Sequence, residues 1–238
     1  MKFVIALNYY SPYVSGLTNV ARDVAEGLAA RGNEVVVVTT AHDRALASEE
    51  IINDVRVVRH PVAIRIGKGV VAPGLVGGIV REAVDADVVN LHAPMLEAGF
   101  AAALVKSRTA ASVVLTYHCD VSLPPGPLNT LQGRLMDRAS RMAARNADAV
   151  VVSTEDYARN SRISASLLPK LEVIAPGCHD RDRGTAEFRD GTGLHVGFLG
   201  RIVEEKGIDY LVRGFRALDD PAARLLIAGD FAQIAGGR

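Results

Sequence analysis

Short runs of β-branched residues alternate with helical patterns along most of this 238-residue chain. The strand-like run at residues 3–7 is followed by a helical pattern over 18–31 and then by a second run over 34–40. Gly32 suits the left-handed end of the helix between them. Three apolar residues form one stripe on that helix: Val20, Val24 and Leu28. This order predicts a βαβ unit, since parallel strands need a crossover helix between them.

The same alternation continues toward the middle of the chain. Further strands are expected at about 55–59, 87–91, 112–117, 149–153 and 172–175, and further helices at about 73–84, 96–107, 128–146 and 155–167. The strands are almost continuously apolar, which is typical of a parallel sheet covered by helices on both faces. The sequence therefore predicts an α/β fold of the doubly wound kind.

The character of the sequence changes after Pro176 and Gly177. Residues 179–193 are polar, charged and rich in glycine, which predicts a linker after a first domain at 1–178. The run LHVGFLG, a helical pattern over 206–218 and the run RLLIAGD then repeat the βαβ order. Residues 194–238 therefore begin a second domain of the same kind. About 45 residues cannot cover both faces of a parallel sheet, so we expect this domain to be incomplete and the chain to be truncated.

Charge and cysteine content exclude several classes of protein. The chain has 27 Lys plus Arg and 27 Asp plus Glu, so no overall field holds a nucleic acid. Cys119 and Cys178 lack CxxC spacing, which favours a reducing, cytoplasmic compartment over a zinc site or a disulfide framework. No stretch reaches the roughly 18 uninterrupted apolar residues of a spanning helix, although binding to a membrane surface stays open.

The first candidate site is the loop after the first strand. Ligands of open parallel sheets bind where strands end, because helix N-termini point their N–H groups there. Gly16 lets a ligand approach the backbone, and Ser15 can cap the helix that follows. A purely structural turn would need the same glycine. The chain contains neither GxGxxG nor GxxxxGK[ST], which disfavours dinucleotide oxidoreductases and P-loop kinases.

The second candidate site is the segment Tyr117-His118-Cys119-Asp120 at the end of a buried strand. Its polar groups can hydrogen-bond sugar hydroxyls. The alternative is a histidine that only satisfies a loop carbonyl. A Ser-His-Asp hydrolase has little support, because no GxSxG elbow follows a strand.

The third candidate site lies at the entry to the helix of the second domain. Arg201 and Lys206 are five residues apart and can converge on a pyrophosphate, the arginine as a bidentate fork and the lysine as a point charge. The dipole of the helix would assist them. The alternative is an ordinary solvated helix start.

A basic stripe is expected on the helix over 128–146. Its four arginines have i, i+4, i+7 and i+11 spacing: Arg134, Arg138, Arg141 and Arg145. We expect three apolar residues to back the stripe: Leu131, Leu135 and Met142. Such a stripe could face anionic lipid, or it could be a solvent-exposed helix face.

Taken in order, these segments resemble the family 4 retaining glycosyltransferases of the GT-B fold, which include phosphatidylinositol mannosyltransferases and many polysaccharide and glycolipid synthases. The resemblance covers the whole chain. It is carried by the Ser15-Gly16 loop, LAARGNEVVVVTT, TYHCD, VIAPGCHD and GFLGRIVEEKGIDYLVRGF with LLIAGD. It implies two Rossmann-like, doubly wound domains, an acceptor-side domain first and then part of a nucleotide-sugar-binding domain.

The resemblance also implies roles for single residues. Arg201 and Lys206 would bind the donor diphosphate, and Gly16 would lie near the phosphates. His118 would be the catalytic residue beside the transferred sugar. Tyr117 and Asp120 would contact the acceptor or the sugar. The donor would be a nucleotide-diphosphate sugar, used without a metal or cofactor, and the acceptor a glycan or lipid hydroxyl at the inner face of the cytoplasmic membrane.

The sequence departs from the family pattern at two points. The hinge strand ends in Pro-Gly-Cys-His-Asp, where the family commonly has Pro-Asn-Gly-Val-Asp. The paired-glutamate motif, which in the family holds the ribose and sugar of the donor, is not reached. Two other functions therefore stay open. One is a remnant or fragment that acts at most as a binding domain, and the other is a GT-B sugar-nucleotide epimerase, which needs no acceptor.

Overall fold

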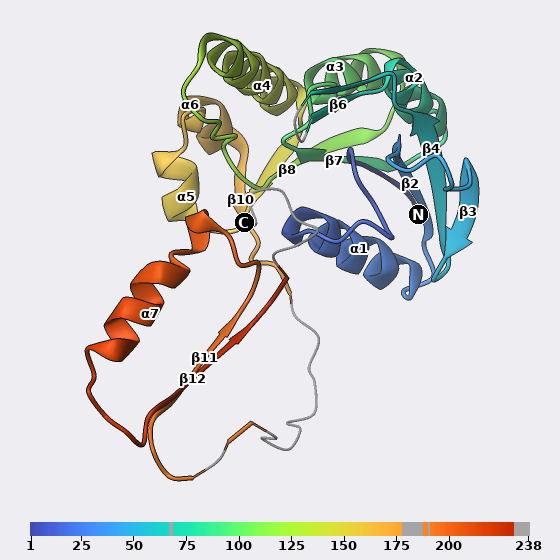
Figure 1. Ribbon diagram of the computed structural model, residues 1–238. Coiled ribbons are helices and arrows are strands. Elements are labelled where there is room, and N and C mark those ends of the chain that lie inside the picture. Colours follow the sequence, from blue (N-terminus) through green and yellow to red (C-terminus); the bar gives the residue numbers. More distant parts are fainter. Residues whose placement is uncertain (67–68, 178–187, 190, 231–238) are drawn as a thin grey trace. The chain divides into compact units, whose positions relative to one another are not determined.

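The computed structural model describes residues 1–66, 69–177, 188–189 and 191–230. It divides into two compact units, Met1–Cys178 and His179–Arg238, which are described separately (Figure 1). Most of the predicted linker at 179–193 lies outside the described residues, as does Cys178.

An eight-stranded sheet in the order β10-β9-β8-β7-β1-β2-β4-β3 forms the centre of the first unit. Its strands are β1 (Lys2–Ala6), β2 (Glu34–Ala41), β3 (Glu49–Ile52), β4 (Val55–Pro61), β7 (Val88–Ala93), β8 (Ser112–Tyr117), β9 (Ala149–Val152) and β10 (Leu171–Val173). All neighbours pair in parallel except β3 and β4. The expected parallel sheet is confirmed. Sequence reasoning missed the antiparallel edge strand β3 and the small hairpin of β5 (Ile64–Ile66) and β6 (Gly69–Val71).

Helices lie on both faces of this sheet. They are α1 (Gly16–Ala29), α2 (Pro73–Glu82), α3 (Ala98–Arg108), α4 (Pro127–Asn146), α5 (Glu155–Asn160) and α6 (Ser164–Leu167), the last followed by the 3₁₀ turn Leu168–Lys170. One core joins α2, α3 and α4 to strand residues such as Leu91 and Leu115. A second core joins α1 to residues such as Ile5 and Val37. Figure 1 shows α1 on the opposite side of the sheet from α2 and α3, which is the doubly wound arrangement.

The two faces are covered unevenly. Asn90 pairs in register with Ile5 and therefore lies on the face that α1 covers. Asn90, Val114 and Thr116 on this face are nevertheless only half-buried. Helices cover both faces of the sheet as expected, but on this face the cover does not extend over β7 and β8. The physical reason is that, among the described residues, α1 alone covers this face and its core reaches β1, β2 and β4.

The first helix has Ser15 and Gly32 at its two ends as the sequence predicts, although it spans Gly16–Ala29 and not 18–31, and it turns a different stripe inward. The Thr18 amide donates to the Ser15 hydroxyl at 3.1 Å, and Gly32 has a φ of +79°. Ala21 and Ala25 are fully buried, whereas Val24 is 41% exposed, so the predicted stripe through Val24 is wrong. Small residues on the inner face let the helix approach the sheet closely, which periodicity among larger apolar residues does not reveal.

The predicted helix over 155–167 is two helices, because the chain leaves the helical path at Ser161. The backbone of Ser161 is extended, with a ψ of 146°. Its hydroxyl donates to Asp120 Oδ1 at 2.8 Å and accepts from the Ile163 amide at 3.2 Å. A serine that finds such partners competes with the helical hydrogen bonds.

The second unit contains the parallel pair β11 (His195–Leu199) and β12 (Arg224–Ala228), the 3₁₀ turn Glu204–Lys206 and α7 (Ile208–Arg216). The expected βαβ order is present, but the helix begins after Lys206 because Gly207 takes a left-handed φ of +62°. No residue of α7 is buried. The second domain is thus incomplete in the part of the chain that the structure describes.

Within the described ranges, none of the helices combines the length and the apolar character needed to span a bilayer.

Candidate functional site

The strand order of the first unit has its switch point between β1 and β7. From β1 the chain continues to β2 on one side, and it later returns to β7 on the other side. In open α/β sheets the loops after two such strands leave in opposite directions, and ligands bind at the carboxyl edge between them. The segment over residues 117–120 follows β8, the strand next to β7. The second candidate site therefore lies beside this switch point.

Asn8 and Glu97 connect the two loops that flank the switch point. Asn8 Nδ2 lies 3.5 Å from Glu97 Oε2, and the Ala72 amide donates to Glu97 Oε1 at 3.2 Å. Glu97 is only 8% exposed. Sequence reasoning missed both residues. Their position just after strands was the available signal, but 89 residues separate them and only the sheet order brings them together.

His118 is held at the end of β8 and forms a pair with His92 on β7. The His118 amide donates to the Ala93 carbonyl at 3.0 Å, which continues the pairing of the two strands. His92 Nδ1 lies 2.9 Å from His118 Nε2, and the two rings stack with centroids 5.1 Å apart. Sequence reasoning missed His92. The signal was a histidine within an apolar strand, because a buried imidazole requires a hydrogen-bond partner.

Both histidines are neutral at physiological pH. Burial lowers the pKa of His92 to about 3, and the neighbouring His118 adds to this effect. Burial likewise lowers the pKa of His118 to about 4. Each ring therefore carries one N–H and one acceptor nitrogen.

Asp120 fastens the segment after β8 to the region of α5 and α6. Tyr117 OH donates to Asp120 Oδ1 at 2.6 Å, and the Arg162 amide donates to Oδ2 at 3.1 Å. The Ser161 hydroxyl also donates to Oδ1. Burial alone would raise the pKa of Asp120, but these hydrogen bonds outweigh it, and the pKa lies below its usual value. That Tyr117 and Asp120 contact an acceptor or sugar stays a prediction, and the structure gives them a positioning role besides.

An aromatic group lies at the same edge of the sheet, after β1 and β2. The rings of Tyr9 and Tyr13 stack at 4.5 Å, and His42 meets Tyr13 edge-on at 5.5 Å. Gly16 follows in the first turn of α1, where an added Cβ would meet no atom within 4 Å. Neither the φ angle of Gly16 nor its surroundings therefore require a glycine for folding.

Arg201 and Lys206 lie in the second unit, whereas Gly16 and His118 lie in the first. The Gly200 amide donates to the Ala228 carbonyl at 3.0 Å, so the loop with Arg201 starts directly at the strand end. Arg201 is exposed and pairs with Glu205. Lys206 is exposed, and no ion pair involves it within the described residues.

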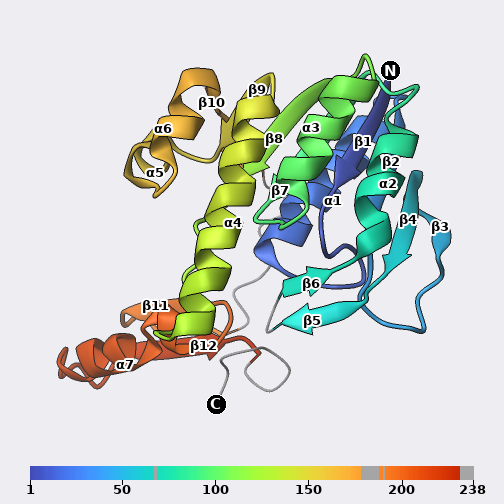
Figure 2. The same cartoon turned by 90° about the horizontal axis from the view of Figure 1, so that it is seen from above.

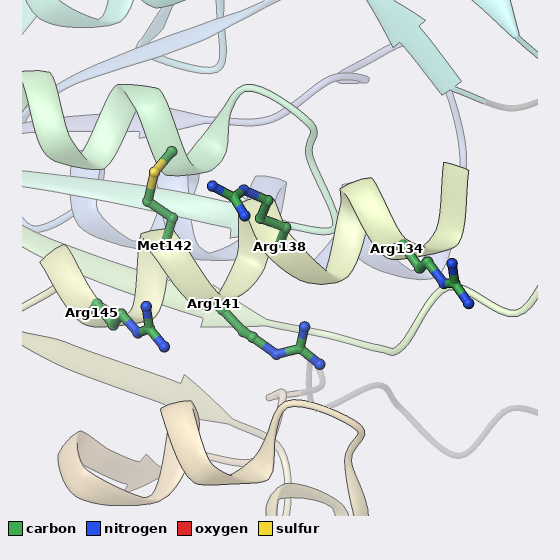
Figure 3. A pocket seen from close by; sticks show the side chains of 5 residues that line it. All are labelled: Arg134, Arg138, Arg141, Met142 and Arg145. Atoms are coloured by element: carbon green, nitrogen blue, oxygen red, sulfur yellow. The ribbon is translucent and has the colours of Figure 1, made fainter. Parts of the chain in front are cut away.

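The arginine surface of α4 consists of Arg134, Arg138, Arg141 and Arg145, which with Met142 line a cavity of about 440 Å³ (Figure 3). In this view the side chain of Arg138 extends on the same side of α4 as that of Met142, whereas Arg141 and Arg145 extend on the opposite side. The arginines therefore form a broad surface and do not converge on one point. Leu131 and Leu135 are 55% and 46% exposed, so the expectation that they back the stripe is wrong. The inner face consists of smaller residues: Ala139, Ser140, Ala143 and Ala144.

The comparison with known families decides the class of the protein. A sequence model described as "Glycosyl transferase 4-like domain" matches residues 15–177. The chain belongs to the glycosyl transferase 4-like family. Among the curated proteins, it is 27% identical to a GDP-mannose-dependent alpha-mannosyltransferase of Corynebacterium glutamicum over 247 residues. That alignment covers 97% of this chain and 57% of the relative, so the chain spans little more than half of the relative's length.

Solved structures give this glycosyl transferase 4-like chain its fold type. A sucrose-phosphate synthase from Thermosynechococcus elongatus superimposes with a TM-score of 0.67 at 17% identity, over 99% of this chain and 64% of that one. The Anabaena protein HepE, in complex with UDP and glucose, gives a TM-score of 0.60 at 18% identity, over 95% and 60%. The fold is of the GT-B type, with the second domain incomplete, as the resemblance in the sequence implies.

Within residues 1–66, 69–177, 188–189 and 191–230, no group of three His, Cys, Asp or Glu side chains is gathered in a way that could hold a metal ion.

Proposed function

We propose that this chain carries the acceptor-side domain and the first part of the donor-side domain of a retaining glycosyltransferase. The enzyme would move a sugar from a nucleotide-diphosphate sugar to an acceptor hydroxyl. The observation that carries the proposal is His118, a neutral, partly accessible histidine at the switch-point edge of a glycosyl transferase 4-like domain. Sugar hydroxyls and an imidazole are matched hydrogen-bonding partners.

A nucleotide-sugar donor is supported from two sides. One relative is named for its dependence on GDP-mannose, and HepE was solved with UDP and glucose. In this chain, Arg201 and Lys206 stand at the loop after β11, where a guanidinium fork and an ammonium group can neutralise a diphosphate. Gly16, with open space around its α-carbon, gives phosphates access to the start of α1. Neither a metal nor a cofactor is part of the proposal.

The proposed reaction is attack by the acceptor hydroxyl on the same face of the sugar that the diphosphate leaves. Most of the developing negative charge is on the leaving diphosphate, so cationic groups and helix N-termini lower the barrier most. His118 would hold a hydroxyl of the sugar or acceptor in place, which contributes through orientation. The stacked rings of Tyr9 and Tyr13 support an acceptor with a carbohydrate ring.

Replacing Lys206 with alanine is expected to weaken nucleotide-diphosphate binding about tenfold, because one charged hydrogen bond to the diphosphate is lost. Isothermal titration calorimetry with GDP and UDP on the protein at its native length measures the effect. Arg216→Ala is the matched control, since it removes an exposed cation from the same unit. Equal affinities of the Lys206→Ala and parent proteins would remove Lys206 from the donor site.

Incubation with the donor sugar, once alone and once with an acceptor, distinguishes the open alternatives. A transferase releases a nucleoside diphosphate in step with glycosylated acceptor and leaves the sugar configuration of unused donor unchanged. An epimerase converts the donor without any acceptor. A remnant would bind without turnover. Proton NMR of the donor and chromatography of the nucleotide follow all three outcomes in the two incubations.

We also propose that the arginine surface of α4 binds the inner face of the cytoplasmic membrane. Exposed Leu131 and Leu135 beside cationic side chains have the composition of an interfacial helix. Arg134, Arg138 and Arg145 are exposed and have no ion pair within the described residues, so their charges are available to anionic headgroups. A lipid-linked acceptor would fit such a location.

The double replacement Arg138→Gln with Arg145→Gln is expected to lower binding to anionic vesicles about 30-fold, since each surface cation contributes about 1 kcal/mol near an anionic membrane. Co-sedimentation with phosphatidylglycerol vesicles measures this, and phosphatidylcholine vesicles give the neutral reference. Arg31→Gln with Arg44→Gln changes the net charge equally at distant positions and serves as the control. Binding that follows neither lipid charge nor these arginines would refute the membrane role.

A further inference from the structure

We infer that His92 is a positioning residue that fixes the tautomer of His118, so that His118 presents its Nδ1–H as a hydrogen-bond donor to a ligand oxygen. The nature of the ligand rests on the proposed function. The tautomer itself does not, because it follows from the surroundings of the two rings.

The contact between the rings requires unequal roles. His92 Nδ1 and His118 Nε2 are 2.9 Å apart, which is hydrogen-bond distance. Each neutral imidazole has one donor and one acceptor nitrogen, so one ring donates and the other accepts. Two arrangements satisfy this contact: either His92 carries its proton on Nδ1 and donates, or His118 carries its proton on Nε2 and donates.

The far nitrogen of His92 decides between the arrangements. His92 is 1% exposed, and its Nε2 is buried without a hydrogen-bond partner among the described residues. If His118 donated, the single proton of His92 would be on Nε2, as a buried donor without an acceptor. Buried N–H groups without partners are rare in proteins, and rarer than acceptors whose lone pairs are not all used. If His92 donates, its proton is used in the contact between the rings.

The nitrogens of His118 fit the second arrangement. Its Nε2 is then the acceptor, so its proton is on Nδ1. No hydrogen bond to Nδ1 is present within the described residues, and this atom is not among the buried unsatisfied ones. Nδ1 is therefore accessible from outside the fold. With His92 as the donor, every ring N–H of the pair has either a protein partner or access to solvent and ligand.

The strands hold the pair in this geometry. His92 pairs in register with Thr116, so His118, two residues further along, lies on the same face as His92. One step back on that face, Asn90 Nδ2 donates to Thr116 Oγ1 at 2.9 Å. This row of cross-strand contacts places both imidazoles on rigid backbone, which positions a functional side chain better than a loop does.

The chemical consequence is that His118 recognises a lone pair. An Nδ1–H binds a sugar hydroxyl through its oxygen, or a phosphate oxygen, and cannot accept a proton from an attacking hydroxyl at that atom. His118 would therefore orient the sugar or the acceptor and would not act as a general base.

Nitrogen-15 NMR of the labelled chain without any ligand tests the tautomer. Long-range proton–nitrogen correlations of the ring should show His118 protonated at Nδ1 and unprotonated at Nε2, with His92 protonated at Nδ1. His118→Gln and His92→Asn assign the signals by their loss. A His118 protonated at Nε2 in the parent chain would overturn the inference.

Two replacements of His92 test the positioning role. Asparagine can place an amide N–H where imidazole Nδ1 stood, and leucine cannot. We expect His92→Asn to keep His118 protonated at Nδ1, and His92→Leu to give a mixture of tautomers. An unchanged tautomer in a folded His92→Leu protein would contradict the role of His92. If leucine prevents folding, the spectra of the parent and of His92→Asn still decide.

Activity separates this inference from the proposed function. In the native-length enzyme, we expect His92→Leu to lower kcat for sugar transfer about tenfold with donor affinity unchanged, and His92→Asn to recover most of the rate. If the NMR result is as expected and neither variant changes transfer, His92 sets the tautomer but the proposed role of His118 in transfer is wrong. If leucine and asparagine reduce transfer equally while the asparagine variant keeps the tautomer, His92 does not act through the tautomer of His118.

Discussion

Replacing His118 with alanine is expected to lower the rate of sugar transfer by at least about 100-fold, the cost of losing one preorganised donor in a site of this kind. Donor binding should stay nearly unchanged, because the proposed diphosphate ligands Arg201 and Lys206 lie in the other unit. Removing the imidazole also leaves the buried His92 Nδ1 without its partner, so the stability of the variant is measured beside its activity. Turnover of GDP-mannose and UDP-glucose by the native-length protein measures the rate, and calorimetry measures the affinity.

His118→Asn is the informative partner of this variant. An amide can place an N–H near the position of imidazole Nδ1, so we expect it to retain more transfer than alanine does. Transfer at the parental rate in His118→Ala would return His118 to a structural role and would remove the main support for the proposed function. Equal loss of donor affinity and rate would mean that the histidine acts on the donor nucleotide.

Replacing Asp120 with alanine is expected to destabilise the first unit by about 3 kcal/mol at neutral pH, since three hydrogen bonds are lost at about 1 kcal/mol each. The donors left without a partner are the Tyr117 hydroxyl, the Ser161 hydroxyl and the Arg162 amide. Tyr117 is 2% exposed, so its hydroxyl has little access to water as a replacement. Urea unfolding followed by circular dichroism measures the loss. Glu155→Ala, which breaks only an exposed pair with Arg159, should change stability by less than about 0.5 kcal/mol.

The contribution of Asp120 also has a defined dependence on pH. The pKa of Asp120 is lower in the folded protein than in the unfolded chain, so the charged carboxylate stabilises the folded state. This contribution is fully present above the unfolded pKa of about 3.9 and is lost as the pH falls through the lower folded value. The stability difference between parent and Asp120→Ala should therefore narrow below about pH 4. If the stability difference between the parent and Asp120→Ala stayed constant down to pH 2, the contribution of Asp120 would come from packing and not from its charge.

Local patterns in the sequence were sufficient for most of the fold. β-Branched runs predicted the parallel strands, and Ser15 and Gly32 marked the ends of α1 because capping depends on neighbouring residues. The break between α5 and α6 could not be predicted, since it depends on a hydrogen bond from Ser161 to Asp120, 41 residues earlier in the chain. The strand β3 was missed because its four residues include two glutamates. Charges are typical of edge strands and weaken the strand pattern.

The position of His118 at a strand end was predictable, but its neighbours in the fold were not. His118 follows a buried strand, and the carboxyl ends of parallel strands are where ligands bind, so its location followed from the sequence. Its partner His92 required the register between β7 and β8, which no local pattern contains. Asn8 and Glu97 required the strand order. Side chains that meet across a sheet are therefore the part of a candidate site that one sequence does not reveal.

The uneven helical cover of the sheet gives the two halves of the first unit different resistance to local opening. β1 and β2 have a helical layer on each face (Figure 2), so we expect their amides to exchange only through opening of the whole core. β7 and β8 have one helical layer and one half-buried polar face. His118 is thus on backbone held firmly from one side and is accessible from the other, whereas His92 is buried behind it. In a sheet covered on both faces, a rigid strand is also an inaccessible one. Here one face of β7 and β8 packs against helices and keeps the strands rigid, and the other face leaves room for a ligand.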